Sequence, residues 1–258
     1  MSNAWAAWIG YRGEKEKLFV AKTDGPDRQA IAEGEFFHPS LAAGVDGILY
    51  LAVSAHIGDT WKIGVAIGLG SKWSKLETIS NGGPDISPRA AVDSSGRLWV
   101  VWQGYRDGRS RILARALKGS WQPEIAVSEN SLNAWEPAVA TDSGGRAHFA
   151  WDAYDEGNYN IYYRPHDGRK LAEVRQVTQS PRFHAHASVA CDRANRPWLA
   201  WDEGGANWGK DTGFLIGSNA GEPLYVSRRP APGGADRGRS PHAQPAFRLS
   251  RTGADHRR

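Results

Sequence analysis

A repeating unit of about fifty residues dominates this sequence and limits the folds it can adopt. In the clearest copies a proline opens a short alternating run, an Asp-x-x-Gly-Arg turn follows, and a second run ends in tryptophan. Six matched positions are spaced 49 residues apart: Pro88, Asp93, Gly96, Arg97, Trp102 and Ile112 recur as Pro137, Asp142, Gly145, Arg146, Trp151 and Ile161. A later copy contains Asp192, Arg196 and Trp201. Repeats of this length, with four short strands per unit, are typical of a β-propeller.

The repeat predicts one all-β domain over residues 1–226, a β-propeller of about five visible four-stranded blades. We place the repeats near residues 4–34, 35–83, 84–132, 133–181 and 182–226. The first repeat lacks its first strand, and the last is incomplete, with a weak third strand expected over 213–217. Two interpretations remain open: the ends pair and close the ring, or the chain is a piece of a longer propeller.

Residues 227–258 differ in composition from the repeats, because they are rich in Pro, Gly and Arg and have almost no strand pattern. We expect this tail to be disordered, since it offers little apolar surface to bury. The net charge of the whole chain is +4, and the tail alone carries +6. Residues 1–226 therefore carry a net charge of −2. A basic patch on the folded body is therefore not expected, and nucleic acid is not a predicted partner.

Other sequence signals exclude several classes of protein. Cys191 is the single cysteine, so no internal disulfide is predicted. The apolar run over residues 4–9 is too short for a secretory signal and lacks a preceding basic region. No segment reaches the ~20 apolar residues of a membrane span.

The strand order assigns the connecting segments to two opposite faces. The Asp-x-x-Gly turns join the first and second strands, where we expect Gly to take a positive φ and Asp to cap the turn backbone. The segments entering the first strand and leaving the second strand lie on the other face. Matched positions entering the first strand hold His38, Ser87, Glu136 and His186; those leaving the second begin with Gln103, Asp152 and Asp202. We expect these groups to converge on one mouth of the central channel, on loops.

Three hypotheses compete for this mouth. The first is a divalent metal held by His38, His184 and His186, joined by Glu136 and Asp202. His184 and His186 are expected to share one strand face. The alternative is that these histidines only hydrogen-bond to neighbouring loops. No other cofactor is predicted.

The second hypothesis is acid–base cleavage of a glycoside by a pair of carboxylates. The candidates are Glu136, Asp152, Asp202 and Glu203. The alternative is structural: Asp152 and Asp202 cap strand ends, or pair with Arg106 or Arg182.

The third hypothesis is binding of a carbohydrate or peptide without catalysis. Aromatic side chains in polar segments offer flat faces to a sugar, and amide and guanidinium groups offer hydrogen bonds. The candidates are Tyr105, Arg106, Trp135, Tyr154, Asn158, Asn207 and Trp208. The alternative is that the aromatic rings pack between blades.

The segment DSSGRLWVVW (93–102) resembles the bacterial BNR-type repeats of sialidase-superfamily propellers. The resemblance covers about residues 4–217. It implies a propeller fold and membership of exported, multi-domain bacterial proteins in which the propeller binds or scaffolds. The Arg-Ile-Pro segment of sialidases is absent from this sequence, so the resemblance does not imply sialidase activity. The favoured function is therefore a non-catalytic ligand-binding or interaction propeller; the alternative is a glycoside hydrolase of sialidase-like fold.

Overall fold

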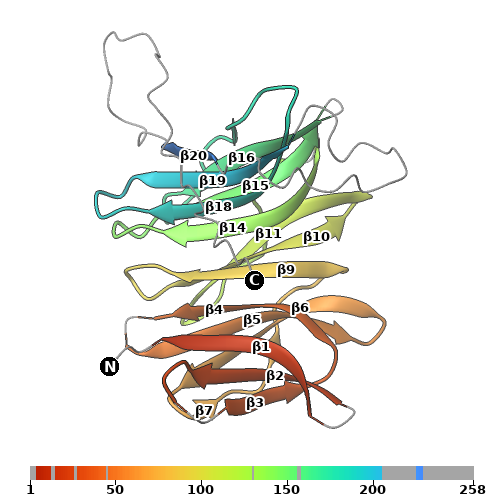
Figure 1. Cartoon of the computed structure of the whole chain (residues 1–258), viewed down its shortest axis with the longest axis vertical. Coiled ribbons are helices and arrows are strands. Elements are labelled where there is room, and N and C mark those ends of the chain that lie inside the picture. The colour runs from red at the N-terminus through yellow and green to blue at the C-terminus, as the bar shows by residue number, and fades with distance from the viewer. Residues whose placement is uncertain are drawn as a thin grey trace, which may run out of the picture.

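The computed structural model describes residues 4–12, 15–25, 28–44, 46–129, 131–155, 158–204 and 225–228. Five antiparallel sheets, here called blades 1 to 5, follow one another along the chain (Figure 1). Blade 1 is formed by β1 (Trp5–Arg12), β2 (Lys15–Lys22) and β3 (Arg28–Glu33). It lacks the strand that opens the following repeats, as the alignment predicts.

Blades 2, 3 and 4 correspond to the three whole repeats. Blade 2 is formed by β4 (Phe36–Ala43), β5 (Ile48–Ile57), β6 (Thr60–Leu69), β7 (Lys72–Trp73) and β8 (Glu77–Thr78). Blade 3 is formed by β9 (Asp85–Val92), β10 (Leu98–Arg106), β11 (Arg109–Lys118), β12 (Ser120–Trp121) and β13 (Ile125–Ala126). Blade 4 is formed by β14 (Asn133–Thr141), β15 (Ala147–Asp155), β16 (Asn158–His166) and β17 (Arg175–Gln176).

Blade 5 is formed by β18 (Phe183–Cys191), β19 (Pro197–Gly204) and β20 (Tyr225–Arg228). Its third described strand is β20, which pairs with β19. The strand predicted over 213–217 lies outside the described residues. Ser227 and Arg228, predicted to begin the tail, belong to β20, and the rest of the tail also lies outside the description.

The first strands of blades 2 to 5 pack side by side: β4 contacts β9, β9 contacts β14, and β14 contacts β18. These four are called the innermost strands. Blade 1 and blade 5 lie at opposite ends of the molecule in Figure 1, and no described strand of one pairs with the other. The described strands therefore show no pairing of blade 1 with blade 5 that would close a ring.

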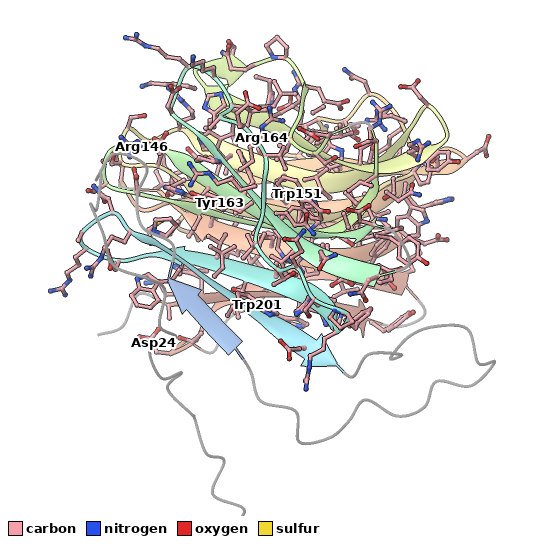
Figure 2. All side chains as sticks on the ribbon, turned by 90° about the horizontal axis from the view of Figure 1, so that it is seen from above. Asp24, Arg146, Trp151, Tyr163, Arg164 and Trp201 are labelled. Carbon is pink, nitrogen blue, oxygen red and sulfur yellow. The ribbon has the colours of Figure 1, made fainter. Side chains whose placement is uncertain are left out.

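The core consists of apolar clusters between successive blades. Trp102 and Leu98 of β10 face blade 2 and pack with Ile63, whereas Trp99 and Val101 face blade 4. Because both faces of such a strand are covered, the run over 98–102 is buried throughout. Trp151 and Tyr163, labelled in Figure 2, fill the equivalent spaces on the two sides of blade 4.

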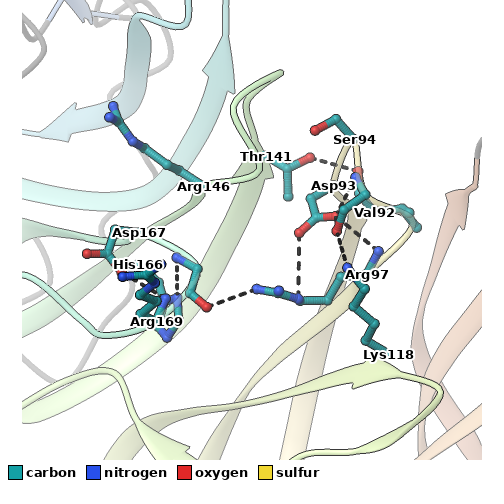
Figure 3. Close-up of polar contacts among 12 residues, drawn as sticks. Val92, Asp93, Ser94, Arg97, Lys118, Thr141, Arg146, His166, Asp167 and Arg169 are labelled. Atoms are coloured by element: carbon teal, nitrogen blue, oxygen red, sulfur yellow. Dashed lines mark hydrogen bonds and ion pairs between the residues drawn. The ribbon is translucent and has the colours of Figure 1, made fainter.

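The Asp-x-x-Gly turns have the predicted geometry. Asp93 Oδ1 accepts a hydrogen bond from the backbone N–H of Arg97 (Figure 3). It also accepts one from the backbone N–H of Ser95, and Gly96 has φ 75°. Asp142 Oδ1 accepts the equivalent bond from Arg146, with φ 77° at Gly145. In blade 5, where the repeat has no glycine, Asn195 takes the left-handed conformation, which Asn tolerates better than most residues. Among the described residues no helix is long and apolar enough to span a membrane.

Candidate functional site

The four matched positions His38, Ser87, Glu136 and His186 share an unusual backbone conformation. Each has a positive φ, of 52°, 55°, 46° and 55° respectively. Each also lies in a β-bulge, where two residues of an innermost strand oppose one residue of the neighbouring strand. A bulge redirects a side chain out of the regular pleat, and left-handed non-glycine residues cluster at functional sites. These four residues are called the inner rim.

On one side of the inner rim, His38 and Ser87 form a hydrogen-bonded pair between blades 2 and 3. His38 Nδ1 lies 2.9 Å from Ser87 Oγ. Partial burial of the imidazole and the charge of Arg89 lower the pKa of His38, and Glu136 opposes this shift. This imidazole is therefore neutral at physiological pH.

On the other side, the imidazole of His186 lies between two carboxylates. His186 Nδ1 is 2.8 Å from Asp202 Oδ2, and His186 Nε2 is 3.3 Å from Glu136 Oε2. Burial alone would lower the pKa of His186, but the hydrogen bond to Asp202 and the nearby carboxylate charges outweigh it, so the net shift is upward. All three side chains are about half exposed or more. The arrangement favours a protonated imidazolium that holds both carboxylates in place.

Asp152 lies next to the backbone of His186 and is buried, unlike the three exposed side chains. The residue is 3% exposed, and the backbone N–H of His186 donates to its Oδ1 at 3.3 Å. Burial, with a smaller contribution from the charge of Glu136, raises the pKa of Asp152 to about 7. We call Glu136, Asp152, His186 and Asp202 the acid–base cluster. The catalytic and metal hypotheses shared these residues between them, and the structure brings all four together.

The hydrogen bond from the backbone of His186 to Asp152 in the preceding blade has a counterpart between blades 3 and 2. The N–H of Ser87 donates to Ser54 Oγ at 3.0 Å, as the N–H of His186 does to Asp152. Ser54 stands at the position that Gln103, Asp152 and Asp202 occupy in later repeats, and it was not among the residues predicted for the site. The spacing of 16 residues after the rim position is the signal that would have identified it.

The rim and its neighbours lie on strands, not on the loops that the sequence predicted. Tyr105 and Arg106 belong to β10, because the hairpin closes in a two-residue Asp107-Gly108 turn with φ values of 50° and 77°. An Asp-Gly turn with both φ values positive matches the strand twist, so pairing continues to its edge. Strand ends hold side chains more rigidly than long loops do.

Several predicted site residues have structural partners instead. The Arg106 guanidinium binds the fully buried Asp85 at 2.8 Å and also contacts Glu124, so it is committed within blade 3. Glu203 pairs with Arg182 at 2.9 Å and with His184 at 3.3 Å. Asn158 donates its amide N–H groups to the carbonyls of Ser180 and Arg182. The predicted alternative pairs, Arg106 or Arg182 with Asp152 or Asp202, are absent from the described ion pairs.

His184 and His186 do not act as a pair, contrary to the expectation of a shared strand face. The bulge between Ala185 and Ser188 interrupts the alternation, so the two rings contact different residues. His184 is 3% exposed and contacts Glu203, whereas His186 reaches the exposed rim. His38 contacts Ser87 in another blade junction. In the described part of the chain, no group of three or more His, Cys, Asp or Glu side chains has an arrangement that could hold a metal ion.

The aromatic candidates divide into exposed and packed rings. Tyr105 is 51% exposed and Tyr154 is 43% exposed, at matched ends of β10 and β15. Tyr154 and Trp135 both contact Tyr159, with centroids 5.2 and 5.4 Å apart. Asn207 and Trp208 lie outside the described residues.

Comparison with known proteins supports the fold. The sequence matches no family model, and no curated protein matches it. Similar solved structures include a protein of unknown function from Dyadobacter fermentans, with TM-score 0.57, 12% identity, and coverage of 72% of this chain and 64% of that one. The GH93 alpha-L-arabinofuranosidase of Fusarium graminearum, in complex with arabinobiose, has TM-score 0.56, 13% identity, and coverage of 76% and 63%. The alpha-L-arabinanase of Penicillium chrysogenum, also with arabinobiose, has TM-score 0.57, 14% identity, and coverage of 86% and 73%.

This chain thus spans somewhat less than two thirds of the length of the first two structures. At such low identity the likeness extends to architecture and not to chemistry. The chain is an all-β protein with the β-propeller fold.

Proposed function

We propose that the chain cleaves a glycosidic bond in a glycan, using the acid–base cluster of the inner rim. The observation that carries the proposal is the contrast between Asp152 and Glu136. Asp152 is buried with its pKa raised to about 7, while the Glu136 side chain is 50% exposed and paired with His186. Two neighbouring carboxyl groups in contrasting environments are the pattern that separates a general acid from a base.

The proposed step follows from these states. Protonated Asp152 donates its proton to the glycosidic oxygen, which leaves as the hydroxyl of one sugar. Ionised Glu136 removes a proton from a water molecule, whose oxygen bonds to the anomeric carbon of the other sugar. Asp202 is a positioning residue, because it holds His186, which in turn contacts Glu136.

The fold is consistent with this proposal, since the arabinofuranosidase and the arabinanase share it. The likeness to BNR-type repeats of the sialidase superfamily is part of the same proposal. It is supported by the Asp-capped turns of Asp93, Asp142 and Asp192 in three successive blades.

Glycan binding without cleavage is the second candidate function. It is favoured by the exposed rings of Tyr105 and Tyr154, which lie at the same end of their strands as the cluster. An exposed aromatic face stacks on a sugar without any acid–base group.

Turnover of a panel of aryl glycosides and polysaccharides, including arabinan, tests the first proposal. We expect Asp152→Asn and Glu136→Gln each to lower kcat by about 100-fold or more, since general acid–base groups contribute that much. Activity with the wild type should decline above about pH 7, as Asp152 loses its proton.

Glu77→Gln is the matched control, because Glu77 is an exposed carboxylate on the short outer strand β8. Absence of turnover across the panel, or full activity in both cluster variants, would reject cleavage. Binding that is lost only in a Tyr105→Ala, Tyr154→Ala double variant would then favour the second candidate.

A further inference from the structure

We propose that His38, Ser87 and Arg89 form a second subsite beside the acid–base cluster, one that binds an oxyanion on the glycan. The oxyanion is a sugar carboxylate or a sulfate ester, which present the same oxygen chemistry. This inference rests on the proposed function, because it names the substrate class of the same rim. The three residues come from β4 and β9, which pack side by side.

Arg89 is the starting point of the argument. The innermost strands β4, β9, β14 and β18 contain one Lys or Arg between them, and it is Arg89. The side chain is exposed, and one guanidinium N–H donates to the carbonyl of Pro88 at 3.1 Å. Among the described residues Arg89 forms no ion pair with a carboxylate, although Glu136 lies on the neighbouring innermost strand β14.

An arginine left without a carboxylate at such a position has free donors. The guanidinium carries five N–H groups in a fixed plane, and that plane matches two oxygens of a carboxylate or sulfate. Arg106 and Arg182, at the same end of their blades, differ in this respect, since Arg106 binds Asp85 and Arg182 binds Glu203.

His38 and Ser87 complete the group. Arg89 follows Ser87 by two residues in β9, and its charge adds to the larger effect of burial in lowering the pKa of His38. The hydrogen bond between His38 Nδ1 and Ser87 Oγ fixes both side chains on the rim. The bulged backbones of His38 and Ser87 turn these two side chains out of the pleat, so a hydroxyl and a neutral imidazole lie next to the strand that carries the Arg89 guanidinium.

Charge separates the two sides of the rim. The acid–base cluster contains three carboxyl groups and one imidazolium, whereas the His38–Ser87–Arg89 group contains a cation and no acid. An anionic substituent is repelled by the first side and attracted by the second. The subsite therefore orients a charged glycan across the rim in one direction.

Calorimetric binding to the full chain with Asp152→Asn, which slows cleavage during the measurement, tests the subsite. The probes are a uronic-acid disaccharide, its carboxyl-reduced counterpart and a sulfated neutral disaccharide. We expect Arg89→Gln to weaken binding of a charged probe by about 10- to 100-fold, as for loss of hydrogen bonds to a charged group. Binding of the reduced probe should change by less than about twofold.

Arg193→Gln is the matched control, because Arg193 is an exposed arginine in the turn between β18 and β19, on the opposite face. Arg89→Lys should retain part of the affinity, since lysine keeps the charge but not the planar fork. An NMR titration of His38 verifies that Arg89→Gln remains folded: loss of the arginine charge should raise the pKa of His38. Tighter binding of one charged probe identifies the oxyanion as carboxylate or sulfate.

Equal affinity for charged and reduced probes, or equal effects of Arg89→Gln and Arg193→Gln, would overturn the subsite. Failure of the subsite and failure of the cleavage proposal are distinguishable. Cleavage of neutral glycans that depends on Asp152, without any charge preference, would leave the function standing and remove the subsite. Arg89-dependent binding of a charged probe that the wild type never cleaves would support the subsite and reject the cleavage proposal.

Discussion

Asp152 shows how position alone can change the chemistry of one side chain. Its carboxyl group and that of Asp202 occupy matched places in successive repeats, yet Asp152 is buried and the Asp202 side chain is 63% exposed. The next blade covers Asp152, and the backbone of His186 donates to it. Blade 5 is the last described blade, so Asp202 has no described blade beyond it.

The stability of the protein should depend on the ionisation of Asp152. Burial raises its pKa from 3.8 to about 7, so between these values the folded chain holds a proton that the unfolded chain has released. The stability of the wild type therefore falls as the pH rises through this range. Asp152→Asn removes this loss and should be more stable than the wild type near pH 8 by a few kcal/mol, at roughly 1.4 kcal/mol per pKa unit.

Urea denaturation near pH 4 and near pH 8 measures this difference. Near pH 4 the wild-type carboxyl is largely protonated in the folded state, so the advantage of the variant should largely disappear. Asp107→Asn is the control, because the Asp107 side chain is 81% exposed. An advantage of the same size at both pH values would show that burial of the charge is not its cause.

At the scale of the element, matched arginines connect blades 3 and 4 each to the blade before it. Arg115 donates to the carbonyl of Ile79 in blade 2 at 2.7 Å, and Arg164 donates to that of Val127 in blade 3 at 2.9 Å. Each also binds a carbonyl of its own blade, at Gln122 and Ala172. Arg164 lies on β16 and is labelled in Figure 2.

Loss of one such link should destabilise the fold without affecting the rim. Arg164→Met keeps the apolar part of the side chain but removes the donors, and leaves the carbonyl of Val127 without this bond. We expect a loss of about 1 to 3 kcal/mol in the free energy of unfolding, measured by urea denaturation. Arg169→Met, at an exposed turn, serves as the control. Equal stability of the two variants would show that the link between blades contributes nothing.

The sequence predicted the blades well because the repeat encodes them locally. In blades 3 and 4 the second strand is an apolar run with Trp102 or Trp151, and the turn before it is Asp-x-x-Gly, so neither needs a distant partner. The matched rim positions His38, Ser87, Glu136 and His186 were also visible from the spacing. Their bulges were not, because an extra residue in a strand appears only once its pairing partner is known.

The partners of the charged groups could not be predicted for the same reason. Arg106 pairs with Asp85, and these residues lie 21 positions apart on two strands whose register the sequence does not state. Glu203 and Arg182 present the same problem in blade 5. The raised pKa of Asp152 depends on the neighbouring blade that buries it, which is a property of the assembled fold.

At the scale of the whole molecule, the blades form a series in which each contacts its neighbours. Blade 3 has apolar clusters on both faces, against blades 2 and 4. Blade 1 has a described cluster on one face, formed with blade 2 by residues such as Leu18 and Leu51. Stability in such series is approximately a sum of units and interfaces.

Hydrogen exchange should therefore follow position in the series. We expect the backbone amides of β2 to exchange faster than those of β10, although each is the middle of three paired strands. Exchange measured by mass spectrometry over hours tests this expectation. Equal protection of β2 and β10 would mean that the described blades unfold as one cooperative unit.

The inner rim has a consequence for how such proteins can acquire new chemistry. One backbone shape presents a histidine, a serine, a glutamate and a second histidine at four equivalent places. Substitution of any one of these four residues would alter the reactivity of the inner rim while strand pairing stays the same. The substrate range of such proteins can therefore diversify by substitution at four positions, with no insertion and no change in a loop.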